Sequence, residues 1–190
     1  MNYAALLQQR FGQQFQTPPE AWEQFVEHCE PVHAAKDAVL KPHGAAERFF
    51  YFIVQGSAGI FLWKDSHSVC LDFAFDGQFC ADYMSLLTRQ PTPLELTALE
   101  PSELLRMRIE DYDLLTNKSV GSMIRLMAAE SSFVDKQQQQ IELLTRSAEE
   151  RYEILLTRFP GIANRIAQKH IASYLGITPQ SLSRIRKQIR

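Results

Sequence analysis

The last twenty-odd residues constrain this 190-residue chain more than any other stretch. Counted from Gln168, a small residue falls at the fifth position, a glycine at the ninth and a branched apolar residue at the fifteenth; these are Ala172, Gly176 and Leu182. A small residue lets a second helix cross closely, and glycine can take the left-handed conformation that ends a helix. The stretch therefore predicts two short helices joined by a tight turn, which is the helix-turn-helix pattern.

The second predicted helix has a start signal and two distinct faces. Thr178 can cap it, and Pro179 suits its first turn, where a missing N–H costs nothing. Helical spacing puts Leu182, Ile185 and Ile189 on one face. The opposite face carries Gln180, Ser183, Arg184 and Lys187. We expect the first face to pack and the second to enter a groove; an ordinary helical hairpin with a solvated basic face is the alternative.

The net charge of -2 is spread unevenly along the chain. From Ile154 to the end there are seven Lys or Arg and no Asp or Glu, whereas residues 1–153 hold thirteen basic residues against 22 acidic ones. A polyanion is therefore attracted to one end only, which is typical of a DNA-binding segment joined to an acidic body.

Composition narrows the class of protein, with 45% hydrophobic and 22% charged residues, as in globular domains. No apolar run approaches the roughly 18 residues that span a bilayer, and no secretion signal is visible, so we expect a cytoplasmic protein without a membrane partner. Cys29, Cys70 and Cys80 are widely spaced and form no CxxC pair. This spacing supports neither a zinc site nor an iron–sulfur cluster, so free thiols, no metal and no cofactor are expected.

The first 116 residues change pattern near Pro31. Before it, two amphipathic helices are expected to cover a sheet. After it, short apolar or alternating runs follow at 38–40, 49–54, 58–63, 68–75, 94–99 and 104–109. Strands at this spacing, mostly joined by hairpins, predict an antiparallel sandwich or barrel. Residues 83–87 interrupt the strand pattern and are expected to form an inserted helical turn.

A long helix is predicted from about Lys118 to Thr145, because no proline breaks it and no glycine follows Gly121. Steps of four and three, which are heptad spacing, connect Val120, Ile124, Met127, Ser131, Val134, Gln138 and Ile141. This spacing predicts a seam against the same helix of a second subunit; packing against the chain's own barrel is the alternative. A hinge near residues 145–147 and a further helix over 149–158 are expected to lead into the terminal motif.

The order of these parts resembles the Crp/Fnr family of bacterial transcription regulators. Residues 52–60 are similar to the family's barrel signature, and residues 76–79 to the turn that opens its phosphate-binding cassette. The resemblance implies an α+β fold with an antiparallel β-barrel sensor domain of the double-stranded β-helix, jelly-roll or cupin-like kind. It divides the chain into the N-terminal helices and barrel over 1–116, a dimerisation helix over 117–146 and a helix-turn-helix DNA-binding domain over 147–190.

The resemblance is weakest in the effector cassette. In cyclic-nucleotide-binding members a glycine–glutamate pair holds the ribose, and an arginine followed by a small hydroxyl residue clamps the cyclic phosphate. Aligned from Gly77, these positions fall on Ala81 and Asp82, and on Thr92 and Pro93. Neither Thr92 nor Pro93 supplies the arginine's charge, and a desolvated phosphate without its cation is costly. Arg89 could replace it if the loop is reshaped; otherwise the cassette is degenerate and does not respond to cyclic AMP.

The function that the resemblance implies is a homodimeric, sequence-specific regulator that is not an enzyme. Two recognition helices roughly 34 Å apart would enter successive major grooves of a pseudo-palindromic double-stranded DNA operator. Gln180 and Arg184 are the first candidates for base contacts, because Gln suits adenine and Arg suits guanine, followed by Ser183 and Lys187. The candidates for phosphate contacts are Lys169, Thr178, Ser181, Arg186 and Arg190.

Two other functions remain open on the sequence alone. The chain could be a ligand-binding barrel module that regulates a protein partner through its C-terminal helices. An enzyme is the weakest alternative, because no Ser/His/Asp order, metal-ligand spacing or phosphate-binding glycine loop is present. RNA polymerase and an unknown small-molecule effector are further partners that the resemblance brings into consideration.

Overall fold

The structure is a computed structural model that describes residues 1–65, 67–117 and 119–189. For residues 14, 15, 119, 120, 123, 124, 127, 128 and 131 it describes the backbone only. Two helices come first, α1 (Tyr3–Phe15) and α2 (Pro19–Glu27). Their apolar sides bury Leu7 and Trp22 against Phe52 and Leu105 of the sheet, so they cover it as the sequence predicts.

The centre of the molecule is made of two four-stranded antiparallel sheets, with strand orders β1-β8-β3-β6 and β2-β7-β4-β5. The strands are β1 (Cys29–Ala34), β2 (Val39–Lys41), β3 (Phe49–Gln55), β4 (Ser57–Lys64), β5 (His67–Phe75), β6 (Phe79–Cys80), β7 (Leu94–Ala98) and β8 (Ser102–Arg108). Between the sheets, side chains of both contribute to one core, including Tyr51 and Ile53 from one and Ala58 and Leu96 from the other. The α+β class with antiparallel sheets is therefore confirmed.

The strand connections differ from the predicted ones. Within the described part of the chain, β4 and β5 are the only consecutive strands that pair with each other, whereas β1 pairs with β8 and β3 pairs with β6 and β8. The expectation of mostly hairpin-joined strands was therefore wrong. Strands β1 and β6 were not predicted, because β1 contains Pro31 and two exposed polar residues, Glu30 and His33, and β6 has two residues.

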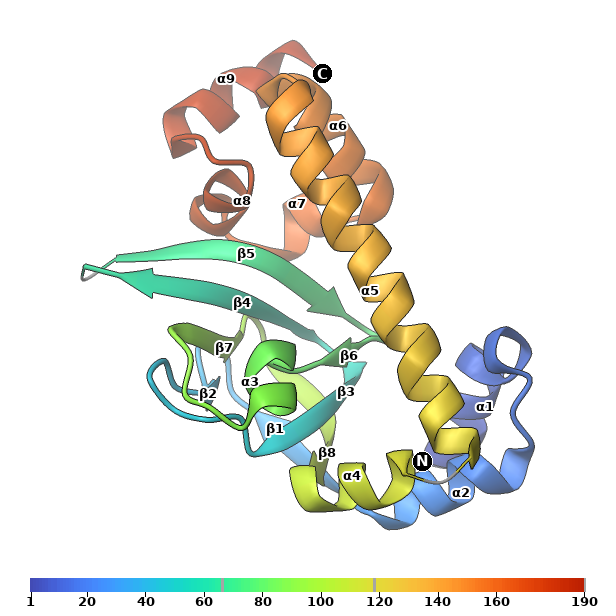
Figure 1. Cartoon of the computed structure of the whole chain (residues 1–190). Coiled ribbons are helices and arrows are strands. Elements are labelled where there is room, and N and C mark those ends of the chain that lie inside the picture. Colours follow the sequence, from blue (N-terminus) through green and yellow to red (C-terminus); the bar gives the residue numbers. More distant parts are fainter. Residues whose placement is uncertain (66, 118, 190) are drawn as a thin grey trace.

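Further helices follow the strands or interrupt them in the described part of the chain: α3 (Tyr83–Thr88), α4 (Ile109–Thr116), α5 (Ser119–Thr145), α6 (Ala148–Arg158), α7 (Ile162–Arg165), α8 (Gln168–Tyr174) and α9 (Pro179–Gln188). In Figure 1, α5 runs from the end of the molecule where α1, α2 and α4 lie to the end where α6 and α9 lie. A capping box starts α6, because Ser147 and Glu150 each bond the other's backbone N–H. The chain therefore reverses between α5 and α6, at the predicted hinge.

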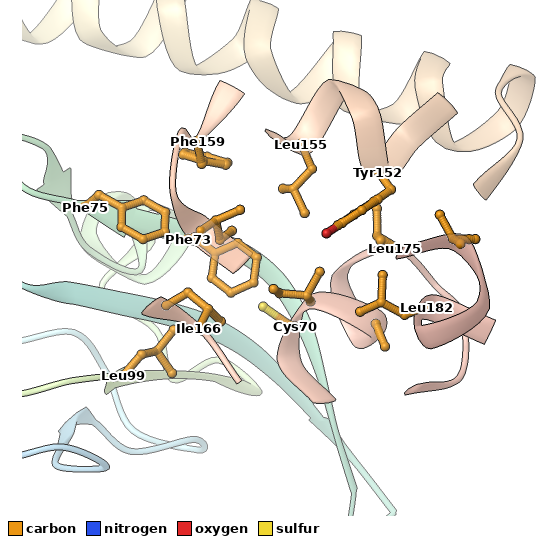
Figure 2. Close-up of a cluster of buried hydrophobic side chains, with 14 of the residues drawn as sticks. Cys70, Phe73, Phe75, Leu99, Tyr152, Leu155, Phe159, Ile166, Leu175 and Leu182 are labelled. Carbon is orange, nitrogen blue, oxygen red and sulfur yellow. The ribbon is translucent and has the colours of Figure 1, made fainter. Parts of the chain in front are cut away.

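The C-terminal helices pack on the outer face of β5, and Figure 2 shows the side chains that meet there. The barrel contributes Phe61, Cys70, Phe73, Phe75 and Leu99. The helices contribute Tyr152, Leu155, Phe159, Ile162, Ile166, Ile171, Ala172, Leu175, Leu182 and Ile185. Every one of these side chains is buried, so the barrel and the C-terminal helices share one apolar core in this structure.

An irregularity in β5 orients this packing surface. The register shifts between Ile60 and Phe61 of β4, which pair with Asp72 and Cys70, so β5 has one extra residue at this point. A strand alternates its side chains between two faces, and one extra residue reverses the alternation beyond it. Cys70 therefore lies on the same side as Phe73, in the core shared with the helices.

Arg165, at the end of α7, fastens the edge of the shared core. Its guanidinium nitrogens lie 2.6 Å from Asp76 Oδ2 and 2.6 Å from Glu100 Oε1, and one donates to the Gly56 carbonyl oxygen at 2.9 Å. Burial by itself raises the pKa of Asp76, but the hydrogen bonds from Arg165 and from the Gly56 N–H outweigh it and lower the pKa below its ordinary value. The barrel and α7 are thus joined by an ion-pair network.

We predict that Gly56→Ala destabilises the fold strongly. Gly56 has φ of 114°, and an added Cβ would lie 2.8 Å from the Ser102 Cα atom, so both strain and a backbone clash oppose the substitution. We expect a loss of about 3 kcal/mol in the free energy of unfolding, measured by urea denaturation. Gly44→Ala is the control, because its φ is 73° but an added Cβ meets nothing within 4 Å. A loss in the control as large as that in Gly56→Ala would contradict this explanation.

We also predict that Arg165→Met lowers the free energy of unfolding by about 1 to 2 kcal/mol at neutral pH, because two carboxylates lose their partner while the aliphatic stem is kept. A lowered pKa at Asp76 means that its contribution is present above the ordinary pKa of an aspartate and is lost as the pH falls through the lowered value. Denaturation of wild type between about pH 4 and pH 2 should therefore show a steeper loss of stability than the variant shows.

The matched control for Arg165 is Arg146→Met. Arg146 pairs with Glu150 at 3.2 Å four residues away, and both side chains are about half exposed. An exposed pair of this kind contributes roughly 0.5 kcal/mol or less. Equal losses in the two variants would show that Arg165 acts only as a surface charge.

Candidate functional site

The turn between α8 and α9 has the geometry that the sequence motif requires. Gly176 has φ of 67°, its N–H bonds the Ser173 carbonyl oxygen, and the Ile177 N–H bonds the Ala172 carbonyl oxygen, both at 3.0 Å. This pair of bonds is the Schellman arrangement, which ends a helix with a left-handed residue. Thr178 then caps α9, because its Oγ1 accepts from the Ser181 N–H at 3.1 Å. The two helices are therefore held at a fixed angle by local bonds.

The inner face of α9 is firmly packed. Leu182 is 0% exposed and Ile185 is 7% exposed, and both lie in the core shared with α6, α8 and β5. Ala172 of α8 is also 0% exposed, in agreement with a small residue at the helix crossing. Ile189 differs from the expectation: it is 42% exposed, because it follows the last turn of α9 and lies beyond the packed surface.

The outer face of α9 carries the candidates for base contacts. Gln180, Arg184 and Lys187 are exposed, and Ser183 is partly buried. Four of the candidates for phosphate contacts can be placed: Lys169 and Thr178 are exposed, and Ser181 and Arg186 are partly buried. The hydroxyl groups of Thr178 and Ser181 also hydrogen-bond each other at 3.0 Å as part of the cap. Arg190 lies outside the described residues.

Three arginines have structural partners that sequence reasoning missed. Arg158 lies 3.6 Å from Asp135 of α5, and Arg165 is bound to the barrel. Arg151 donates to the Leu175 carbonyl oxygen at 2.7 Å, so it bonds the C-cap residue of α8. The only sequence signal for these roles is a surplus of acids in the rest of the chain. Positive charge in the C-terminal segment thus serves packing as well as surface potential.

Helix α5 carries a stripe of apolar side chains that face solvent in this single chain. The stripe consists of Leu126, Phe133, Val134, Ile141 and Leu144, each more than half exposed. Helical geometry places the five within about 100° around the axis. Of the predicted seam, Val134 and Ile141 belong to this stripe, whereas the side chains of Val120, Ile124, Met127 and Ser131 lie outside the described residues. Gln138 lies elsewhere, in an open groove between α5 and α6.

The effector cassette is closed by its own side chains. Asp82 is the N-cap of α3 and is 1% exposed, and Thr92 is 5% exposed and donates its hydroxyl hydrogen to Asp82 Oδ2. Lys41 of β2, 2% exposed, lies 2.9 Å from the same oxygen. Sequence reasoning missed Lys41, because an isolated lysine at the end of a short strand gives no signal of burial.

The other cassette positions lie toward the surface. Gly77 occupies the turn between β5 and β6, where its φ is 76°, Ala81 is partly buried and Pro93 is exposed. Arg89 ends α3 with an exposed side chain and pairs with Asp113 of α4. It therefore does not supply a cation to the inside of the barrel, which is the place that an arginine clamp would need.

A second buried acid, Glu47, hydrogen-bonds the backbone of the cassette at Asp82. Glu47 is 4% exposed, and its carboxylate accepts the N–H groups of Arg48 at 3.0 Å, Phe49 at 3.3 Å and Asp82 at 2.9 Å. Burial raises the pKa of Glu47, and the three backbone hydrogen bonds oppose this effect in part. The start of α3 is thus held by hydrogen bonds at both the backbone and the side chain of Asp82.

The described ranges contain neither a metal-ligand cluster nor an activated thiol. No cluster of three or more His, Cys, Asp or Glu side chains suited to a metal ion occurs among these residues. Burial raises the pKa of the Cys29 thiol to about 12, and it also raises the pKa of Cys70 and Cys80, so all three thiols stay protonated at neutral pH. In the same residues, no helix has the length and apolar character needed to cross a membrane.

Comparison with known proteins identifies the barrel. Residues 31–119 match the cyclic nucleotide-binding domain. A comparison with curated proteins gave no match. Among solved structures, the c-di-GMP responsive global regulator CLP of Xanthomonas campestris is 16% identical, with 90% of this chain and 91% of that chain covered and a TM-score of 0.67.

Two further structures share the same arrangement. FixK2 from Bradyrhizobium japonicum is 19% identical, with coverage of 85% of this chain and 84% of that chain and a TM-score of 0.71. The catabolite activator protein of Thermus thermophilus is 19% identical, with coverage of 90% and 83% and a TM-score of 0.53. Residues 31–119 therefore match the cyclic nucleotide-binding domain, and the resemblance to Crp/Fnr regulators that the sequence predicts is confirmed in the fold of the chain.

Proposed function

We propose that this protein is a sequence-specific DNA-binding transcription regulator that acts as a homodimer and does not respond to cyclic AMP. The observation that carries the proposal is the division of α9 into two faces. Leu182 and Ile185 are buried, whereas Gln180, Arg184 and Lys187 are exposed together on the other side. The buried face fixes α9 to the rest of the protein, and the exposed face presents an amide and a guanidinium group. Such a helix suits the major groove of DNA, where the amide can bond adenine and the guanidinium can bond guanine.

Electrostatics and the fold support the same function. The segment from Ile154 to the end contains no acidic residue, so its surface attracts a polyanion. The structural neighbours CLP and FixK2 lie in a group of regulators, and this supports α6–α9 as a DNA-binding domain that follows a sensor barrel and a dimer helix. We place these parts at residues 147–190, 1–116 and 117–146.

The solvent-facing stripe of α5 supports dimerisation. Five large apolar side chains in one stripe are costly to leave in water, and a second copy of α5 would cover them. Pairing through this stripe would also present two copies of α9, as an operator with two half-sites requires. An RNA polymerase contact and a small-molecule effector stay outside the proposal, because no described side chain points to either.

The DNA prediction separates base reading from phosphate binding. The operator is first obtained by selecting bound fragments from the source genome. We then expect Arg184→Ala to lose roughly 1 to 3 kcal/mol of affinity for the operator and to relax specificity at one base pair. Lys169→Ala should weaken all duplexes similarly and reduce the dependence of log K on log salt by about one. Fluorescence anisotropy over a salt series measures both.

Arg106→Ala is the control for these variants, because Arg106 lies on β8 and pairs with Glu30 of the barrel. It should leave DNA binding unchanged. If wild type binds no genomic fragment, or if its binding does not weaken with salt, the C-terminal helices act instead as a docking element for a protein partner.

Two apolar residues of similar exposure lie on different sides of α5, and their substitution tests whether the stripe is the dimer interface. Ile141 is 51% exposed and lies in the apolar stripe, whereas Leu143 is 55% exposed and lies outside it. Because a buried charge without a partner opposes association, Ile141→Glu should convert dimer to monomer at micromolar concentration. Leu143→Glu should leave the dimer intact. Sedimentation equilibrium distinguishes the two, and a wild-type monomer or a dimer lost equally in both variants would refute the stripe as the interface.

A further inference from the structure

The barrel contains an ion pair that is almost completely removed from water. Lys41 Nζ lies 2.9 Å from Asp82 Oδ2, and the two side chains are 2% and 0% exposed. Lysine and aspartate are rarely buried to this extent unless their charges are compensated. A reason for placing both charges here must therefore lie in the structure around them.

Each charge is fully satisfied by groups of this chain. The three ammonium protons of Lys41 have three acceptors: Asp82 Oδ2, Thr92 Oγ1 at 2.9 Å and the Leu94 carbonyl oxygen at 2.7 Å. The Thr92 hydroxyl accepts from Lys41 and donates to Asp82. The other carboxylate oxygen of Asp82 accepts the Ser85 N–H at 3.0 Å. No donor of the ammonium group is left for an added ligand.

The ion pair lies at the effector cassette. Asp82 and Thr92 are ten residues apart, at the two ends of the α3 insertion, and they are in direct hydrogen-bond contact. A ligand that lay between these two positions would have to separate them and expose Lys41. The carboxylate of Asp82 instead lies against the cation, where an external anion would otherwise bind.

We propose that the Asp82 carboxylate is a tethered anion for Lys41, which keeps α3 fastened to β2 and to the start of β7 without an external ligand. The geometry has a direct chemical corollary. Removal of this carboxylate leaves a buried ammonium group beside a vacated space, which is a site for a small carboxylate such as formate. The proposal concerns the barrel alone, so its test measures thermal stability and is independent of DNA binding.

The test is chemical rescue of Asp82→Ala in the 190-residue chain. The variant leaves the Lys41 charge without its partner, so its Tm should fall by about 10 °C relative to wild type. Sodium formate, compared with sodium chloride at equal ionic strength, should raise the Tm of Asp82→Ala by several degrees. Formate should raise the Tm of neither wild type nor the double variant Lys41→Met/Asp82→Ala. The double variant lacks the Asp82 helix cap as the single variant does, but it has no Lys41 charge. A formate effect confined to the single variant is therefore due to the charge and not to the lost cap.

A second set of variants keeps the shape of the side chains and serves if Asp82→Ala does not fold. Asp82→Asn retains an oxygen that can cap α3, and Lys41→Met retains the apolar stem. Each single variant leaves one charge unpaired, so the neutral double variant should have a higher Tm than either single variant. Additive losses in this set, or equal formate effects with and without Lys41, would overturn the proposal.

The final arm of the experiment tests whether cyclic nucleotides bind the barrel. Cyclic AMP, cyclic GMP and c-di-GMP are added separately to wild type and to Lys41→Met/Asp82→Asn. Wild type should show no shift in Tm with any of the three, because binding within the cassette would require breaking the ion pair. A stabilising shift in wild type that the double variant lacks would refute the tethered anion, whatever the outcome of the DNA measurements.

Discussion

The packing of the C-terminal helices on β5 is the contact on which the rest of this structure depends. Phe73 and Phe75 of β5 lie against Phe159, with ring centroids 6.4 and 5.1 Å from it, and the Cys70 N–H donates a hydrogen bond to the Ser173 hydroxyl oxygen at 2.9 Å. Helix α5 holds α6 far less closely, because an open groove of about 570 Å³, lined by residues that include Asp135, Gln138 and Arg146, separates them. The direction in which α9 faces is therefore set by the barrel.

Charge is used for two different purposes in the C-terminal segment. Arg158 and Arg165 face acids of α5 and of the barrel, and they attach the segment to the acidic body. Arg184 and Lys187, in contrast, are exposed to solvent. The uneven charge seen in the sequence thus describes an internal attraction as well as an external one. A charge count does not separate the two, because a paired basic residue and an exposed one contribute the same charge.

Features encoded over a few residues could be predicted, and those that join distant residues could not. Thr178, Pro179 and Gly176 specify the turn before α9 through bonds within six residues, so the sequence located it. The approximate positions of six strands followed from their apolar runs. The pairing of β1 with β8 spans most of the barrel, and no local pattern encodes it. Lys41 is separated from Asp82 by 41 positions, so its partner could not be identified either.

Strand β5 has a core on each of its faces. Ala74 points to the interior of the barrel with Tyr51 and Ile53, while its neighbours Phe73 and Phe75 point to the C-terminal helices. A slip of one residue against β4 would exchange the two faces and place a large ring in the space of a methyl group. The helices therefore favour one register of the hairpin, because only this register gives the barrel interior and the C-terminal helices surfaces that fit.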